Sequence, residues 1–434
     1  MQSEVSEIWG QVGMKVLVLS HMYPSDQNPT YGIFVHEQVK ALAEQGCEIK
    51  VIAPVPWAPW PVSALKKKWQ SYASIPAKDV LDGIEVHYPR YPVLPRSFLL
   101  AEAGYLMFRG MKRLVERLSR EFPFDLIHAH VALPDGQAAV CLKQIYRVPA
   151  VVTIHGQDFQ TTVNRSGRVK AKLLEVLDNA DQIITVSSKL KNIGIKLGEQ
   201  YSFGSKIEVV NNGIDLKVLP PDQTEIRTQA LQSSGYSESG HFFARKDKIR
   251  IVSVSNLKKT KGIDLNIQAL AVLVKKYPNL EYYIVGDGEE RPNLERLVKD
   301  LGLGDKVSFL GRLPHAEALK QIAAADIFSL PSWQEGFGVV YIEAMAQGIP
   351  VIGVRGEGIE DAIVHEQNGL LVRPQDVNDL VKALERLLSS PSFAAKLAAE
   401  AKATVRKKFT WQKNAEKTVN VYKRLLEQRA GRYT

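Results

Sequence analysis

Short runs of β-branched and aliphatic residues alternate with helical patterns along nearly the whole chain. Such runs, bounded by turns, are typical of parallel strands buried on both faces. Strands that alternate with helices form βαβ units, so the sequence predicts an α/β fold. We expect strands at residues 16–20, 49–53, 126–129, 150–154, 182–186, 207–210, 249–254, 281–285, 306–309, 327–330 and 350–354. We expect helices at 35–44, 137–146, 169–179, 189–197, 265–275, 293–300, 316–324, 339–346 and 379–388.

This pattern weakens once, at residues 216–247, which are polar and contain Pro220-Pro221. A single hydrophobic core stops growing near roughly 250–300 residues, so a chain of 434 residues is expected to form two domains. We therefore predict two doubly wound Rossmann-like domains that face a central cleft, where ligands would meet the carboxyl ends of the strands. The predicted parts are an N-terminal extension at 1–13, a first domain at 14–218, a linker at 219–247, a second domain at 248–408, and a C-terminal helix at 409–434 that crosses back to the first domain.

Charge and composition exclude several classes of protein. The chain has 56 Lys and Arg and 47 Asp and Glu, a net charge of +9, which permits an anionic substrate or membrane surface but is too small to indicate nucleic acid. No stretch approaches the ~18 apolar residues of a membrane-spanning helix. Residues 1–13 lack the apolar segment of a secretory signal. Two cysteines are too few for a disulfide framework, so we expect a cytoplasmic protein.

The ends of two expected strands in the first domain carry residues that suit a ligand site. No Gly-x-Gly-x-x-Gly follows the first strand; instead Gly32 lies at the start of a helix, where it would let a phosphate approach the backbone or would be an ordinary loop glycine. His155 follows the strand at 150–154 and is either a cleft residue or a structural histidine. Since no carboxylate or cysteine cluster with metal-ligand spacing surrounds His128 and His130, we expect no metal there.

Lysines gather after the first strand of the second domain. Lys258, Lys259 and Lys261 precede Gly262 and the next expected helix. At such a turn both the helix dipole and an ammonium group favour phosphate. A solvated loop is the alternative interpretation, and the glycine at the helix start favours a phosphate site.

The most informative stretch is residues 331–345. Gly336 and Gly338 begin a helix whose free amides can cradle a diphosphate. Glu343 lies in the first turns of that helix, where a carboxylate can accept two hydrogen bonds from a ribose diol. We expect Glu335 to face the same ligand and Glu343 to have a partner, because an unpaired buried carboxylate is costly. The alternative is a pair of glutamates that stabilise only the helix and the edge of the core.

With these residues in place, the chain resembles the retaining nucleotide-sugar glycosyltransferases of family 4, which have the GT-B fold. Glu335 and Glu343 form the E-x7-E pattern of that family. Its other motifs occur in order as His155-Gly156-x-Asp158, Asn212-Gly213-Ile214-Asp215, Lys261-Gly262, Gly286-Asp287-Gly288, Phe309-Leu310-Gly311, Asn368-Gly369 and Phe409-Thr410-Trp411. The opening at 22–34 and the segment with Trp57 and Trp60 are more similar to the branch of teichuronic-acid biosynthesis.

The resemblance implies three catalytic residues. His155 would contact the transferred sugar or the leaving group, Lys261 would bind the donor diphosphate, and Glu335 would face the donor sugar and the distal phosphate. The implied donor-binding residues are Gly32, Asn256, Lys261, Gly311, Arg312, Leu313, Glu335, Gly336, Phe337, Gly338 and Glu343.

Within that set, the resemblance gives Glu343 to the ribose, Gly32 to the diphosphate from the other domain, and the backbone at 311–313 to the edge of the base. One position departs from the family, which usually has Arg where this chain has Asn256. A neutral amide cannot replace a bidentate cation on phosphate, so Lys258 or Lys259 would have to compensate, or donor affinity would be low.

The resulting prediction is a retaining transferase of cell-surface polysaccharide biosynthesis. It would move a sugar from a UDP- or GDP-linked donor to a glycan or lipid-linked acceptor. No Asp-x-Asp metal motif follows a suitable strand, so we expect neither a cofactor nor an essential metal. Two alternatives stay open, a nucleotide-sugar epimerase and a non-catalytic nucleotide-sugar-binding protein. The missing glycine fingerprint counts against a dehydrogenase.

A basic and aromatic region of the first domain predicts contact with an anionic membrane at its inner face. Trp57 and Trp60 precede Lys66-Lys67-Lys68-Trp69, and a basic helix follows at 107–120. The basic residues of that helix are Arg109, Lys112, Arg113, Arg117 and Arg120, and its apolar side carries Leu99, Leu100, Leu106, Met107, Met111, Leu114 and Leu118. A basic amphipathic helix can lie in a lipid interface, although most amphipathic helices pack on their own core.

Overall fold

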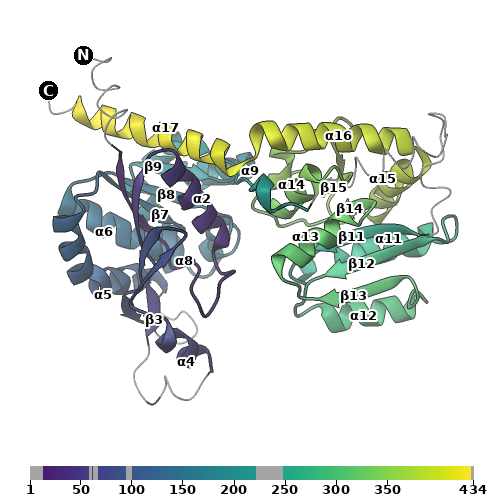
Figure 1. Ribbon diagram of the computed structural model, residues 1–434, viewed down its shortest axis with the longest axis horizontal. Helices are drawn as coiled ribbons and strands as arrows, with labels where there is room; N and C mark the ends of the chain where they lie inside the picture. Colours follow the sequence, from purple (N-terminus) through teal and green to yellow (C-terminus); the bar gives the residue numbers. More distant parts are fainter. Residues whose placement is uncertain (1–12, 58–60, 62–66, 94–99, 221–247, 432–434) are drawn as a thin grey trace. The chain divides into compact units, whose positions relative to one another are not determined.

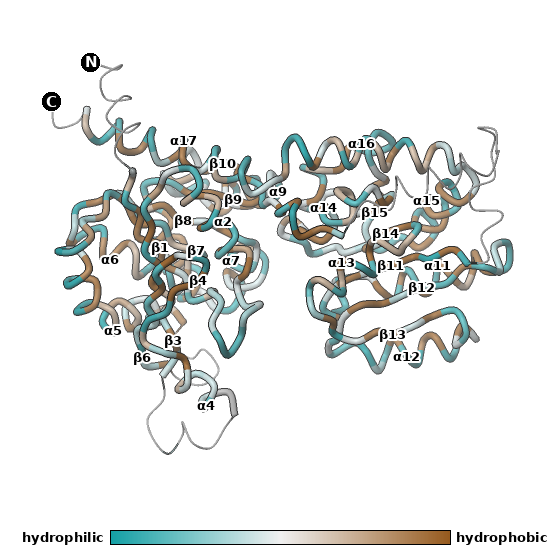
Figure 2. The backbone as a smooth tube through the Cα atoms, viewed as in Figure 1, coloured by the Kyte–Doolittle hydropathy of each residue, from teal (hydrophilic) through white to brown (hydrophobic). Residues whose placement is uncertain are grey.

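The structure is a computed structural model that describes residues 13–57, 61, 67–93, 100–220 and 248–431 (Figure 1). The expected extension, except Gly13, and the expected linker, except its first two residues, lie outside these residues, as do Trp60, Lys66 and Leu99. The chain forms two compact units. Unit 1 comprises Met1–Asn212 and Trp411–Thr434, and unit 2 comprises Gly213–Thr410. Hydrophobic residues gather in the strands of both units (Figure 2).

Unit 1 is built on an eight-stranded sheet in the order β10-β9-β8-β7-β1-β2-β5-β4. All neighbouring strands are parallel except the antiparallel pair β4 and β5. The strands are β1 (Lys15–Leu19), β2 (Glu48–Ile52), β4 (Lys78–Leu81), β5 (Ile84–His87), β7 (Leu126–His130), β8 (Ala150–Ile154), β9 (Gln182–Thr185) and β10 (Ile207–Val209). A separate parallel pair joins β3 (Val55–Trp57) and β6 (Arg90–Pro92). The central strands β7 and β8 are buried along their whole length, as their apolar sequences predict.

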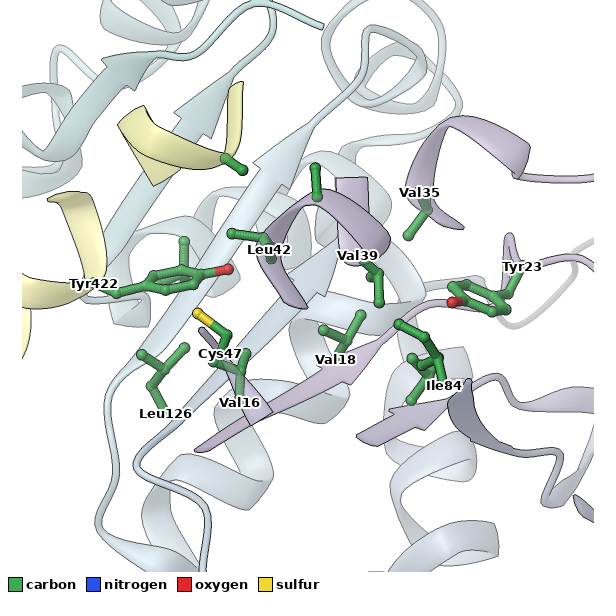
Figure 3. Close-up of a cluster of buried hydrophobic side chains, with 14 of the residues drawn as sticks. Val16, Val18, Tyr23, Val35, Val39, Leu42, Cys47, Ile84, Leu126 and Tyr422 are labelled. Atoms are coloured by element: carbon green, nitrogen blue, oxygen red, sulfur yellow. The ribbon is translucent and has the colours of Figure 1, made fainter. Parts of the chain in front are cut away.

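Helices flank this sheet, and the last of them comes from the C-terminus. The helices of unit 1 are α2 (Ile33–Glu44), α4 (Lys67–Ser74), α5 (Leu100–Glu121), α6 (Gln137–Tyr146), α7 (Gln157–Gln160), α8 (Gly167–Asn179), α9 (Ser188–Leu197) and α17 (Trp411–Ala430). Helix α17 packs against α2. Its Tyr422 is buried in one cluster with Leu42 of α2 and Val16 of β1 (Figure 3). Each such large apolar side chain stabilises the fold by roughly 1.5–3 kcal/mol, so α17 is an integral part of this core.

Unit 2 has a six-stranded, wholly parallel sheet in the order β13-β12-β11-β14-β15-β16. The strands are β11 (Ile249–Val254), β12 (Leu280–Val285), β13 (Val307–Gly311), β14 (Ile327–Ser329), β15 (Val351–Val354) and β16 (Leu370–Val372). The helices are α11 (Ile263–Leu273), α12 (Arg291–Asp300), α13 (His315–Ala323), α14 (Val339–Ala346), α15 (Val377–Ser389) and α16 (Pro391–Lys408). The order reverses at β11, so the loops after β11 and β14 lie at the switch point where such sheets bind ligands.

The chain passes from one unit to the other at two places, between residues 212 and 213 and between residues 410 and 411. The first and last segments of unit 2 lie side by side. The backbone N–H of Ile214 donates to the carbonyl of Phe409 at 3.0 Å, and Ile214 forms a parallel bridge with Thr410. Both ends of unit 2 are therefore joined to each other by backbone hydrogen bonding.

Helix α5 is the basic helix that the sequence places near a membrane. Met107, Met111 and Leu118 are buried on its inner side, where α5 packs against β6, α6 and α8. Of the two interpretations of this apolar side, packing on the core of unit 1 holds for these three residues, which are therefore not available to lipid. The basic residues of the helix are exposed, namely Arg109, Lys112, Arg113, Arg117 and Arg120. No helix among the described residues is both long and apolar enough to span a bilayer.

Candidate active site

The loops after β11 and β14 touch each other in unit 2. Gly262 begins α11 with a left-handed backbone, φ 68°, and a Cβ atom there would lie 2.3 Å from the carbonyl oxygen of Pro331. Only glycine tolerates both conditions without strain. The backbone N–H of Trp333 donates to the carbonyl of Thr260 at 3.0 Å, which ties the loops together. This close approach places Lys261, from one loop, against Glu335 from the other.

Lys261 and Glu335 form the central pair of the site. The Nζ atom of Lys261 lies 2.5 Å from Oε2 of Glu335, and the two side chains are only 20% and 16% exposed. The hydroxyl of Ser332 lies 3.4 Å from the same oxygen, and the backbone N–H of Glu335 donates to Oε2 of Glu357 at 2.6 Å. Glu357 is buried, so the Glu335 loop is held from a second side. Glu357 was not predicted from the sequence, where its signal is a carboxylate between two glycines after a strand.

Helix α14 begins next to the Lys261–Glu335 pair, and the backbone amides of its first turn lie at the same place. Gly338 precedes the helix with φ 90°, and Phe337 before it is buried against Phe409, with ring centroids 5.8 Å apart. The hydroxyl of Tyr341 donates to the carbonyl of Leu330 and fixes the helix on β14. Since the side chain of Phe337 is buried, only its backbone and that of Gly338 are suited to contact a ligand. A helix N-terminus of this kind favours phosphate oxygens.

Glu343 has the partner that its burial requires. Its Oε1 atom lies 2.8 Å from Nε2 of His315 at the start of α13, and the side chain of Glu343 is 13% exposed. His315 carried no motif in the sequence and was missed. Glu335 and Glu343 thus have different partners, Lys261 and His315. The ribose role of Glu343 stays a prediction.

The neighbouring lysines differ from Lys261. Lys259 is 63% exposed and lies 2.5 Å from Oδ2 of Asp264 in the first turn of α11. Asn256 and Lys258 are exposed, and the N–H of Lys258 donates to the carbonyl of Asn256 at 2.9 Å. Lys261, by contrast, donates from its ammonium group to Glu335.

The predicted base-binding backbone lies at the end of β13. The carbonyl of Gly311 accepts from the N–H of Gly286 at 2.8 Å, Arg312 is exposed, and Leu313 is half-buried. The guanidinium of Arg291 lies within 3.8 Å of where a Cβ atom on Gly311 would stand. Arg291, which was not among the predicted site residues, therefore places a cation beside Gly311.

In unit 1, His155 lies at the carboxyl end of β8. Its Nε2 atom lies 3.0 Å from Nδ1 of His130, and the centroid of its ring lies 4.7 Å from the centroid of the Phe34 ring. Burial lowers the pKa of His155 to about 3, so the ring is neutral near pH 7. Its Nδ1 atom is buried and has no hydrogen-bond partner among the residues that the structure describes. Gly32 begins α2 with φ 70°, where a Cβ atom would lie 2.2 Å from the carbonyl of Met22, so local packing alone requires this glycine.

A second pair at this edge of unit 1 was also missed. Nδ1 of His21 lies 2.9 Å from Oδ2 of Asp135, and the His21 backbone N–H donates to the same carboxylate. Burial opposes the charged ring of His21, but Asp135 outweighs it and raises the pKa of His21. Asp158 accepts from the N–H of Ala132 at 2.9 Å and so ties the loop that carries Asp135 to the end of β8. His21 and Asp135 lie 114 positions apart, so the pair gives no periodic signal in the sequence, although each residue follows a strand.

Two family models match the chain. The model described as Glycosyltransferase Family 4 covers residues 32–218, and the model described as Glycosyl transferases group 1 covers residues 238–404. An uncharacterized glycosyltransferase of Methanocaldococcus jannaschii is 31% identical over 361 residues, 81% of this chain and 88% of that protein. The chain belongs to the family of glycosyltransferases that these two models describe.

Two further comparisons agree with this assignment. The putative teichuronic acid biosynthesis glycosyltransferase TuaC of Bacillus subtilis is 29% identical over 408 residues, 93% of this chain and 96% of that protein. The structure of Anabaena HepE in complex with UDP-glucose has a TM-score of 0.65 at 20% identity and covers 94% of this glycosyltransferase and 100% of HepE. The predicted family and the predicted GT-B fold are confirmed.

The comparisons leave the individual roles open. The roles of the catalytic and donor-binding residues stay predictions. The described residues contain no group of three or more His, Cys, Asp or Glu side chains arranged to hold a metal ion. Whether the glycosyltransferase needs a metal also stays a prediction.

Proposed function

We propose that this glycosyltransferase moves a sugar from a UDP-linked donor to a hydroxyl of a glycan or lipid-linked acceptor in polysaccharide biosynthesis, with retention of the anomeric configuration. The observation that carries the proposal is the Lys261–Glu335 pair at the start of α14. A cation and free helix amides at one point are what a departing diphosphate needs. UDP-glucose in HepE and the teichuronic acid role of the relative support the donor and the pathway class.

In this proposal unit 2 binds the nucleotide. Glu343 accepts the ribose hydroxyls, Lys261 contacts the diphosphate, and Glu335 holds the lysine and faces the donor sugar. When the bond between the anomeric carbon and the phosphate oxygen breaks, negative charge grows on the diphosphate. Lys261 and the amide of Gly338 stabilise that charge without reorganising, which lowers the barrier. The acceptor hydroxyl forms the new bond on the same face, and its proton leaves with the diphosphate.

The test is a donor panel with two readouts. The protein is incubated with UDP-glucose, UDP-galactose, UDP-N-acetylglucosamine and GDP-mannose, with and without an alkyl glycoside acceptor. Nucleoside diphosphate release identifies a transferase, and NMR of the product gives the anomeric configuration. An epimerase would interconvert the donor sugars without releasing nucleoside diphosphate. Binding of UDP without release from any donor would instead indicate a non-catalytic nucleotide-sugar-binding protein.

We also propose that the basic face of α5 contacts an anionic membrane surface. Five exposed cations, Arg109, Lys112, Arg113, Arg117 and Arg120, lie on one side of the helix, and Tyr105, one turn in from its start, is 47% exposed. Each cation near such a surface contributes ~1 kcal/mol, so the attraction would be electrostatic, with the apolar side of α5 kept in the core.

Vesicle sedimentation tests this contact. Wild type is expected to sediment with phosphatidylglycerol vesicles and not with phosphatidylcholine vesicles, and high salt should release it. The double variant Arg109→Glu and Arg113→Glu should lose binding. Lys396→Glu with Lys407→Glu, an equal charge change at exposed positions of α16, is the control and should keep binding. Equal binding by both double variants would contradict the assignment to α5.

A further inference from the structure

Three histidine rings lie in a row along the ends of β7 and β8, with His128 and His130 on β7 and His155 just after β8. The ring centroids of His128 and His130 lie 4.5 Å apart, and those of His130 and His155 lie 5.3 Å apart at an interplanar angle of 13°. Burial lowers the pKa of all three rings, to about 3 for His128 and His155. All three are neutral near pH 7, so each carries one N–H donor and one bare nitrogen acceptor.

His128, at one end of the row, is held by hydrogen bonds at both of its ring nitrogens. Nδ1 of His128 lies 2.5 Å from the hydroxyl of Tyr422 in α17, and its Nε2 lies 2.7 Å from Oγ1 of Thr153 in β8. Both nitrogens of His128 are thus engaged. The orientation of the His128 ring is therefore fixed next to His130, and one of the two hydrogen bonds that fix it comes from the C-terminal helix.

At the other end of the row, one hydrogen bond joins the neutral rings of His130 and His155. Nδ1 of His130 and Nε2 of His155 lie 3.0 Å apart, so one of them donates and the other accepts. If His130 donates, the remaining proton of His155 is on Nδ1. If His155 donates, its Nδ1 is a bare acceptor. His130 therefore decides which kind of group His155 offers to a ligand.

The Nδ1 atom of His155 is buried and has no partner among the described residues. A buried polar atom left without a hydrogen bond costs about 1–3 kcal/mol, so a merely structural His155 would be expected to be satisfied. Because the oxygens of a diphosphate carry lone pairs and no protons at neutral pH, they can only accept hydrogen bonds. A ligand of this class requires N–H at Nδ1.

We propose that His130 is a positioning residue that donates Nδ1–H to Nε2 of His155, which leaves His155 with an Nδ1–H donor for an oxygen of the nucleotide sugar. The inference rests on the proposed function of His155 and adds the residue that sets its tautomer. His130 itself does not touch the substrate. Its effect is on the orientation and protonation of one neighbouring ring.

The test compares two substitutions of His130. In His130→Asn the amide nitrogen takes the position of Nδ1 and can still donate, whereas His130→Leu fills the space without a donor. His87→Asn is the control, since His87 is also buried in the sheet of unit 1 and hydrogen-bonded, to Glu85 at 2.7 Å. Nucleoside diphosphate release from UDP-glucose gives kcat, calorimetry gives the UDP affinity, and ring ¹⁵N NMR gives the tautomer of His155.

The expected result separates positioning from folding. In wild type, NMR shows the proton of His155 on Nδ1. His130→Leu lowers kcat roughly 10- to 100-fold, the size typical for loss of a residue that orients a functional histidine, and it also weakens UDP affinity, because an oxygen of the diphosphate loses its donor, while the thermal stability stays close to that of His130→Asn. His130→Asn restores most of the rate, and His87→Asn keeps it.

Three results would overturn the proposal. They are a wild-type His155 protonated on Nε2, a His130→Leu variant with full kcat, and an Asn variant as inactive as the Leu variant at equal thermal stability. A wild-type protein that releases nucleoside diphosphate from no donor would refute the proposed function instead. In that case the NMR tautomer still tests the positioning by His130.

Discussion

Replacing Lys261 with Ala tests the chemistry of the site most directly. The substitution removes the ammonium group that lies 2.5 Å from Glu335. The side chain of Glu335 is only 16% exposed, so water cannot fully replace the lost cation. Loss of one preorganised charge on a developing anion lowers kcat by ~10²–10³, about 2.7–4 kcal/mol in the barrier. Loss of the cation from this mostly buried carboxylate also lowers the free energy of unfolding by about 1–3 kcal/mol. We therefore expect a folded, less stable protein with little turnover.

Lys259→Ala is the matched control for this variant. Lys259 belongs to the same loop and has its own carboxylate partner, Asp264, but its side chain is 63% exposed. An exposed pair of this kind contributes roughly 0–1 kcal/mol. For both variants, kcat is measured as nucleoside diphosphate release at saturating UDP-glucose, and stability is measured by thermal unfolding. A large loss of kcat is expected only for Lys261→Ala.

The opposite pattern would refute the assignment. If Lys259→Ala or Lys258→Ala is the inactive variant and Lys261→Ala keeps its rate, the phosphate site has shifted along the loop to compensate for Asn256. In that event Asn256→Arg should not raise donor affinity.

Three further predictions concern binding and stability. Glu343→Ala should weaken UDP binding by ~1.5–3 kcal/mol, roughly 10- to 100-fold in Kd by calorimetry, with the fold intact; an unchanged Kd would refute the ribose assignment. Gly262→Ala should lower the melting temperature, because a left-handed backbone costs a Cβ-bearing residue about 1–2 kcal/mol and this Cβ would also lie 2.3 Å from the carbonyl of Pro331. Burial raises the pKa of Asp158 to about 7 from an ordinary 3.8, so the folded protein holds a proton that the unfolded chain releases between these values. The free energy of unfolding should then fall as pH rises from about 4 to about 7, and Asp158→Asn should flatten this slope in urea unfolding.

Much of the fold could be predicted because parallel strands buried on both faces leave a strong local signal. The run at 150–154 and strand β8 coincide, as do the run at 249–254 and β11. The hairpin of β4 and β5 was missed, although Asp82-Gly83 between them is a common two-residue turn and both residues have positive φ, 48° and 80°. Both strands are short and half polar, so they lack the apolar run that identified the others.

The candidate site was predicted only where its residues adjoin one another or belong to a motif. Gly262 next to Lys261 and Gly338 near Glu335 marked two strand-to-helix turns. The partner of Glu343, His315, lies 28 residues away and is exposed, so neither spacing nor hydropathy distinguishes it from a surface histidine. Contacts of this kind depend on how neighbouring strands are ordered in the sheet, which a single sequence does not state.

The paired ends of unit 2 have a consequence for how such enzymes can be recombined. The chain enters this unit at Gly213 and leaves it at Thr410, and the hydrogen bond from Ile214 to Phe409 brings the two junctions together. A segment with adjacent ends can be exchanged as one cassette without opening the sheet of the host, whose core is completed by the returning α17. Residues 213–410 are thus a natural unit of exchange between relatives. If unit 2 binds the donor as proposed, a chimaera cut at these two positions would carry the donor preference of the enzyme that supplies this unit.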